Sequence, residues 1–120
     1  APVQVAAIEA LRGPQDSVER MCRAFDERRK LIVRELNSIP GFSCVMPKGA
    51  FYAFPNISAT GMSSAQMQDH LLNEAGVAVI SGTSFGRFGE GFIRFSYAAS
   101  SEQISAALAR IRNLMAPARA

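Results

Sequence analysis

The spacing of apolar residues changes at Pro40-Gly41, and this change constrains the fold more than any other feature of the sequence. From residue 16 to residue 39, apolar side chains recur in steps of three, four and seven positions, which is typical of one face of a helix. Proline cannot continue a helix and glycine tolerates the exit geometry, so the helix is predicted to end here. The apolar positions of this helix are Val18, Met21, Cys22, Phe25, Ile32, Leu36 and Ile39.

Capping signals place the other helices. An Ala-rich helix over residues 3–11 stops before Gly13-Pro14, and its core partners are expected to lie elsewhere. Asp16 or Ser17 is predicted to cap the long helix, because a short polar side chain satisfies free amides of the first turn. Two capping boxes predict two further helices. These boxes are Ser63 with Gln66, before a helix that ends at Gly76, and Ser100 with Gln103, before a helix that Pro117 stops.

Short alternating or β-branched runs after residue 41 predict strands. The predicted strands cover residues 42–46, 50–54, 77–80 and 92–97. Each helix has one apolar face, so the helices should cover one side of a small mixed or antiparallel sheet. The sequence therefore predicts an α+β fold, of the α/β sandwich type, with the second face of the sheet left open.

Size and charge narrow the classes of function. A chain of 120 residues corresponds to one domain, which is small for a complete metabolic enzyme. The net charge of +3 includes no block of like charges, so nucleic-acid binding is not favoured. No apolar run reaches the roughly 18–20 residues that cross a bilayer, and the N-terminus lacks a secretory signal. We expect a cytoplasmic, soluble protein without a membrane partner, in which Cys22 and Cys44 are buried free thiols.

Two motif matches in the glycine-rich segment 81–91 fail their structural requirements. Residues 82–86 match GxSxG, but a nucleophile elbow leads into a helix, whereas this segment leads into a predicted strand. The single histidine, His70, precedes the segment and has no second ligand at metal spacing. A phosphate loop would also need a helix N-terminus after its glycines. We therefore expect no catalytic residue, no metal site and no phosphate loop here.

Arg94 is the strongest candidate for a binding residue. It lies inside an otherwise apolar strand, where alternation predicts Arg94 on one face and Ile93 and Phe95 on the other. A guanidinium on a rigid strand costs desolvation energy unless it meets an anion, and its planar fork suits a carboxylate. The alternative is a structural salt bridge to Glu90 or Glu102, and the pattern alone does not decide between the two.

Three segments resemble motifs of class I aminotransferases. Residues 47–55 are similar to the P-x-G-A-F-Y segment of that family, and residues 76–86 to its G-V-x-V-x-P-G-x-x-F-G. Residues 89–100 resemble its G-E-G-x-[IV]-R-[LF]-S-[YF]-A-x-S. Ser81 stands where the family usually has proline, which we expect to change the stiffness of the loop rather than its chemistry.

The resemblance implies the C-terminal small domain of an enzyme of the aspartate aminotransferase type. In that family a large cofactor domain precedes the small domain. Residues 1–15 would then be the tail of the large domain, residues 16–40 the connecting helix and residues 41–120 the small domain. By the family pattern, Arg94 binds the substrate α-carboxylate. Tyr52, or its neighbour Phe51, falls where the family has an aromatic residue near the substrate, with core packing as the alternative.

The resemblance also implies a cofactor, pyridoxal phosphate, bound mainly by the large domain, and a homodimer in full-length form. The substrates would be an amino acid and a 2-oxo acid. The only lysines, Lys30 and Lys48, match no Schiff-base motif, so the chain alone should be inactive. Two other functions stay open: a non-catalytic interaction or dimerisation module of the same fold, and a domain of a related pyridoxal-phosphate lyase or synthase.

Overall fold

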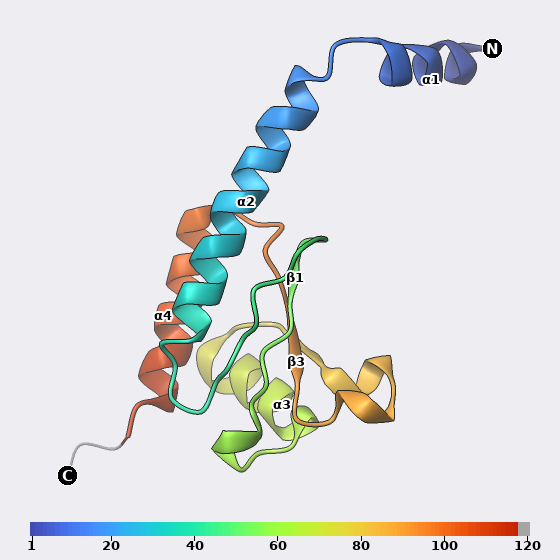
Figure 1. The fold of residues 1–120 in the computed structure, drawn as a ribbon. Helices are drawn as coiled ribbons and strands as arrows, with labels where there is room; N and C mark the ends of the chain where they lie inside the picture. The colour runs from blue at the N-terminus through green and yellow to red at the C-terminus, as the bar shows by residue number, and fades with distance from the viewer. Residues whose placement is uncertain (118–120) are drawn as a thin grey trace.

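A small antiparallel sheet lies at the centre of this computed structural model, which describes residues 1–117 (Figure 1). Its middle strand, β3 (Ile93–Ser96), pairs with β1 (Tyr52–Ala53) on one side and with β2 (Ile80–Ser81) on the other. The helices are α1 (Pro2–Arg12), α2 (Asp16–Leu36), α3 (Ser64–Ala75) and α4 (Ser101–Met115). Short 3₁₀ turns are η1 (Ser58–Thr60), η2 (Gly82–Phe85) and η3 (Arg87–Gly89).

The helices α2, α3 and α4 cover one face of the sheet, so the predicted α+β fold is confirmed. Ile93 and Phe95 of β3 and Ala53 of β1 are buried in one apolar core with side chains from these three helices. The helix residues of this core are Ile32, Val33, Leu36, Met67, Leu71, Ala75, Ile104, Leu108 and Ile111. Exposed or half-buried side chains occupy the other face, which the prediction left open.

The first helix and the first half of α2 extend away from this core (Figure 1). The molecule measures 64 × 30 × 24 Å, and its radius of gyration of 17.6 Å exceeds the roughly 14 Å typical of a compact chain of this length. No residue of α1 is buried, as expected for a helix whose partners lie elsewhere. On α2, Val18 and Met21 belong to the predicted apolar face but remain 45% and 54% exposed. Among the apolar residues of α2, those from Phe25 onward therefore contact the core.

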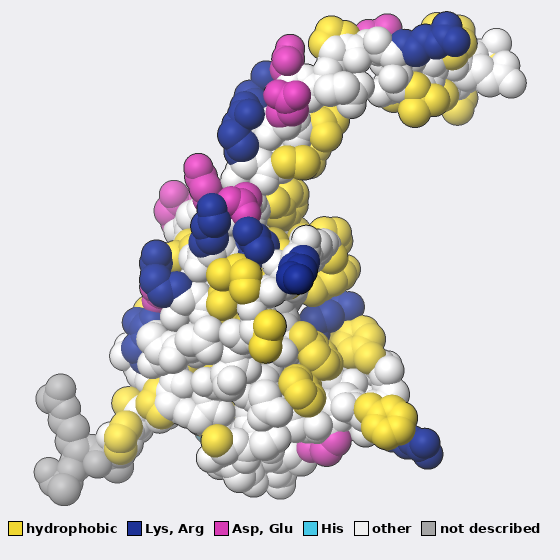
Figure 2. Space-filling view, in the orientation of Figure 1, with side chains coloured by type: hydrophobic (Ala, Val, Ile, Leu, Met, Phe, Trp, Pro, Cys, Tyr) yellow, Lys and Arg dark blue, Asp and Glu magenta, His cyan; other side chains and the backbone are white. Residues whose placement is uncertain are grey.

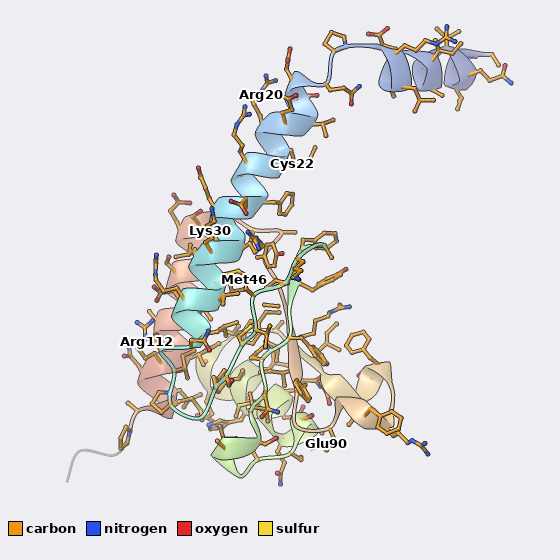
Figure 3. All side chains as sticks on the ribbon, in the orientation of Figure 1. Arg20, Cys22, Lys30, Met46, Glu90 and Arg112 are labelled. Atoms are coloured by element: carbon orange, nitrogen blue, oxygen red, sulfur yellow. The ribbon has the colours of Figure 1, made fainter. Side chains whose placement is uncertain are left out.

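The prediction that both cysteines are buried is wrong for Cys22. Cys44 is buried, and burial raises the pKa of its thiol. Cys22 is exposed on the extended half of α2, where Figure 3 labels it. The periodicity identified its helix face correctly, but none of the described residues covers that part of the face.

Both predicted capping boxes are present, at Ser63 with Gln66 and at Ser100 with Gln103. The predicted side-chain cap of α2 is wrong. Asp16 is already the first helical residue, and Gln15 precedes it without a capping hydrogen bond. The Gln15 amide instead donates to two carbonyl oxygens near the end of α1, those of Ala10 and Gly13. Asp16 still lies in the first turn, where a negative charge interacts favourably with the helix dipole.

The strand predicted over residues 42–46 is wrong, and those predicted over 50–54 and 92–97 are shorter than predicted. The strand predicted over residues 77–80 is wrong for residues 77–79, since β2 begins at Ile80 and continues to Ser81. In the segment 42–46, Ser43 forms an isolated bridge with Asn56. The side chain of Asn37 bonds both backbone groups of Cys44. Asn37 Oδ1 accepts from the Cys44 amide at 2.8 Å, and Asn37 Nδ2 donates to the Cys44 carbonyl at 2.9 Å. One amide side chain therefore replaces the neighbouring strand that the alternating pattern predicts.

Glu35 connects α2 to α4 through a hydrogen bond from Arg112, which Figure 3 labels. This bond lowers the pKa of the Glu35 carboxyl more than partial burial raises it. A carboxyl with a lowered folded-state pKa stabilises the fold above its ordinary value of 4.5, and the contribution is lost as the pH falls through the lowered value.

We therefore expect Glu35→Gln to reduce the free energy of unfolding at pH 7 by about 0.5–1 kcal/mol. The variant should also lose less stability than the wild type when the pH falls from 5 to 3. Urea unfolding at several pH values measures both effects. Glu74→Gln, on the exposed surface of α3, is the control. Parallel pH profiles for the wild type and Glu35→Gln would contradict the assignment.

Candidate functional site

The open face of the sheet carries a cluster of one arginine and four aromatic side chains. They are Tyr52, Phe54, Phe85, Phe92 and Arg94, and we call them the Arg94 cluster. Alternation along β3 places Arg94 here, because Ile93 and Phe95 on either side of it are buried in the core. The predicted assignment of these side chains to the two faces is confirmed.

The Arg94 guanidinium lies over two aromatic rings. Its Cζ atom is 4.2 Å from the ring centroid of Tyr52 and 4.6 Å from that of Phe85. These distances are typical of cation–π contacts. Arg94 is half-buried, and no other described residue forms a hydrogen bond or an ion pair with its side chain. Its N–H donors are therefore available to an external anion.

The alternative of a structural salt bridge has no support among the described residues. Glu90 Oε1 accepts the backbone N–H of Ser64 at 2.9 Å. Hydrogen bonds from its own backbone amide and from the Ser100 side chain lower the pKa of the Glu102 carboxyl, which lies in the first turn of α4. Both carboxylates therefore accept hydrogen bonds at helix N-termini, where the backbone amides of the first turn have no partner within the helix.

The structure brings the two predicted site residues, Arg94 and Tyr52, into direct contact. Phe51, the other aromatic residue that the resemblance suggested, packs on Tyr52 and on Phe25 of α2, with centroid distances of 4.4 and 6.2 Å. Of these two neighbours, Tyr52 is therefore the residue on the open face beside Arg94.

The segment 81–91 holds Phe85 in the Arg94 cluster through close backbone packing. A Cβ atom at Gly82 would overlap the carbonyl oxygen of Gly89 and would lie 2.6 Å from that of Phe92. The Gly82 amide donates to the same Phe92 carbonyl at 2.8 Å. The predicted glycine turn is thus two 3₁₀ turns pressed together, and it leads into β3 rather than into a helix.

Two polar residues of α3, neither of them predicted from the sequence, fix the two ends of this segment. Gln68 Oε1 accepts from the Ser81 amide at 2.7 Å. Ser64 is fully buried, and its Oγ accepts from the Gly91 amide at 2.8 Å and donates to the Gly89 carbonyl. The sequence signal for the role of Ser64 is its position directly after Ser63, which caps α3. Ser81, which departs from the family pattern, supplies an N–H that proline lacks.

A groove of about 610 Å³ lies away from Arg94, between the extended half of α2 and the bend at residues 48–50. Its lining includes Met21, Phe25, Phe51 and Tyr97. Figure 2 shows hydrophobic side chains along one side of the extended part of α2 and charged side chains along the other. Asp26, Arg29 and Lys48 also line this hollow, and Arg94 does not.

The family model for aminotransferase class I and II matches residues 1–111. The chain belongs to this family. The resemblance stated from the three motifs is thereby confirmed.

Individual relatives agree with this assignment. The chain is 50% identical, over 94% of its length, to an aspartate aminotransferase of Pyrococcus horikoshii, and 41% identical to an aromatic-amino-acid aminotransferase of Thermococcus litoralis. The crystal structure of an aromatic aminotransferase from Pyrococcus horikoshii superposes with a TM-score of 0.89, at 42% identity and 93% coverage of this chain. The chain spans only 29–30% of the length of these relatives.

The lysines of this chain do not fit the covalent attachment of pyridoxal phosphate, the cofactor that the family implies. Lys30 Nζ lies 2.6 Å from Asp26 Oδ2 on the exposed surface of α2, where Figure 3 labels it. Lys48 is exposed in a bend. Neither amine lies in the apolar surroundings that make a lysine nucleophilic.

Among residues 1–117, no three His, Cys, Asp or Glu side chains gather as metal ligands would. Within the same range, no helix has the length and hydropathy needed to span a membrane. On the sheet, the Arg94 cluster presents a half-buried guanidinium that forms no ion pair with the described residues.

Proposed function

We propose that this chain is the small domain of an aminotransferase and that Arg94 binds the α-carboxylate of its amino-acid and 2-oxo-acid substrates. The observation that carries this proposal is the Arg94 guanidinium itself. It lies over the rings of Tyr52 and Phe85, with no anionic partner from the described residues. A guanidinium fixed in this way is suited to bidentate binding of a carboxylate.

Arg94 would orient the substrate rather than take part in bond making. In class I aminotransferases, pyridoxal phosphate supplies the chemistry that moves the amino group between an amino acid and a 2-oxo acid. A substrate held by its carboxylate on a rigid strand presents its α-carbon in one orientation, which lowers the entropic cost of reaction. The contribution of this chain is therefore binding and alignment.

The large domain that carries the cofactor would contact residues 1–40. We assign residues 1–15 to the tail of that domain, residues 16–40 to the connecting helix and residues 41–120 to the small domain. The exposed apolar residues Val3, Val5, Ile8 and Leu11 of α1 support this division, since a short helix without core contacts is marginal in water. The full-length enzyme would form a homodimer, as the family pattern implies.

The isolated 120-residue chain should therefore show no transamination. We expect no keto-acid product and no change in cofactor absorbance when the chain is mixed with pyridoxal phosphate, L-aspartate and a 2-oxo acid. The full-length enzyme, assayed in parallel, should turn over. Turnover by the isolated chain would refute the assignment of the reactive lysine to the large domain. An inactive full-length protein would instead support the interaction module.

A further inference from the structure

We propose that Phe85 is a positioning residue that holds the Arg94 guanidinium in the orientation that receives a substrate carboxylate. This inference rests on the proposed function of Arg94 and adds to it a residue that acts through the arginine. The sequence motif that contains Phe85 assigns no role to this residue.

The two rings that contact Arg94 come from segments on opposite sides of its strand. Tyr52 lies on β1, and Phe85 ends the 3₁₀ turn that directly follows β2. Because β1 and β2 flank β3 on its two sides, the rings reach the guanidinium from segments on both sides of its strand. No hydrogen bond from the described residues anchors the Arg94 side chain, so these two rings are the contacts that restrict it.

Phe85 is itself held in place by other aromatic residues. Its ring meets Phe54 edge to face, with a centroid distance of 6.2 Å and an interplanar angle of 79°. Phe54 in turn stacks on Phe92, with a centroid distance of 5.1 Å and an angle of 6°. Both geometries are favourable for aromatic pairs. Phe85 nevertheless remains 53% exposed, so burial in the core does not account for its position.

Ring contacts can restrict the Arg94 side chain and still leave its N–H donors free, which hydrogen bonds to the protein would not. The N–H donors of a guanidinium lie in its plane, and a ring attracts the cation through its face without using those donors. A carboxylate on the protein would neutralise the charge and occupy the donors. Aromatic packing therefore restricts the arginine and leaves it free to bind a planar oxyanion.

The test compares three substitutions in the full-length holoenzyme. Phe85→Leu keeps an apolar side chain but removes the ring, and we expect it to raise KM about 3- to 20-fold with a smaller change in kcat. Phe85→Tyr retains a ring and should restore KM to near the wild-type value. Phe88→Leu is the matched control: Phe88 lies in the same segment, is 84% exposed and packs on Arg87.

A spectroscopic readout separates positioning from a general structural effect. Guanidinium protons over the face of a ring are shielded, so the Arg94 Nε–H resonance of the ¹⁵N-labelled 120-residue chain should move downfield in Phe85→Leu. It should stay in place in Phe85→Tyr and in Phe88→Leu. An unchanged KM or an unchanged Arg94 resonance in Phe85→Leu would overturn the inference. If Arg94→Lys itself left the kinetics unchanged, the proposed function would fail first, whatever the resonance showed.

Discussion

Replacing Arg94 with lysine in the full-length enzyme should lower kcat/KM for amino-acid substrates by about 100- to 1000-fold, or about 3–4 kcal/mol. Lysine keeps the positive charge but cannot form two parallel hydrogen bonds to a carboxylate. It also loses the planar group that lies over the rings of Tyr52 and Phe85. We expect a strongly raised KM together with a lower kcat, because the same fork both binds and aligns the substrate.

Steady-state kinetics with saturating cofactor measure this effect. Arg87→Lys is a suitable control, since Arg87 is exposed in the glycine-rich segment and packs on Phe88 rather than on the Arg94 cluster. The control should keep wild-type constants. If Arg94→Lys did the same, the assignment of the carboxylate site would have to be abandoned.

Replacing Gly82 with alanine should destabilise the chain by about 2–3 kcal/mol, because the added methyl group overlaps the carbonyl oxygen of Gly89 and crowds that of Phe92. The φ angle of Gly82 is not positive, so the cost comes from contact rather than from backbone strain. The two 3₁₀ turns would have to separate, and Phe85 would move with them. We therefore also expect a weaker contact between Phe85 and Arg94.

Urea unfolding measures the stability of this variant. Gly49→Ala is the matched control, since a Cβ atom at Gly49 meets nothing within 4 Å. Gly89→Ala should cost about as much as Gly82→Ala, because each glycine faces the carbonyl of the other. The double variant should cost less than the sum, since one separation of the turns relieves both overlaps. Fully additive losses would show that the two glycines do not share one contact.

The elements that local sequence determines could be predicted, and those that depend on distant contacts could not. The capping boxes at Ser63 and Ser100 rest on side chains three residues apart, so their signal lies within one turn. The strand predicted near Cys44 was wrong because Asn37, seven residues earlier, bonds both backbone groups of Cys44. Alternation gives no information about such a side chain.

The candidate site shows the same limit. The period of two along β3 predicted the face of Arg94. The family resemblance implied that Tyr52 or Phe51 lies near the substrate, but it did not predict the contact between Tyr52 and Arg94. The position of Phe85 depends on the packing of Gly82 against Gly89 and on Gln68 of another element. A glycine-rich pattern indicates turns but not which side chain they present. The groove beside α2 could not be foreseen either, because the helical period does not show how much of a face is covered.

Because the first part of α2 projects beyond the core, a small rotation at one end of the helix produces a large displacement at the other end. Its 21 residues span about 31 Å, and only the end near Ile32 and Leu36 is embedded in the core that carries Arg94. A rotation of about 10° around the free end displaces the embedded end by about 5 Å. A small angular change at the start of α2 would thus displace the core and Arg94 together, without any rearrangement inside the Arg94 cluster.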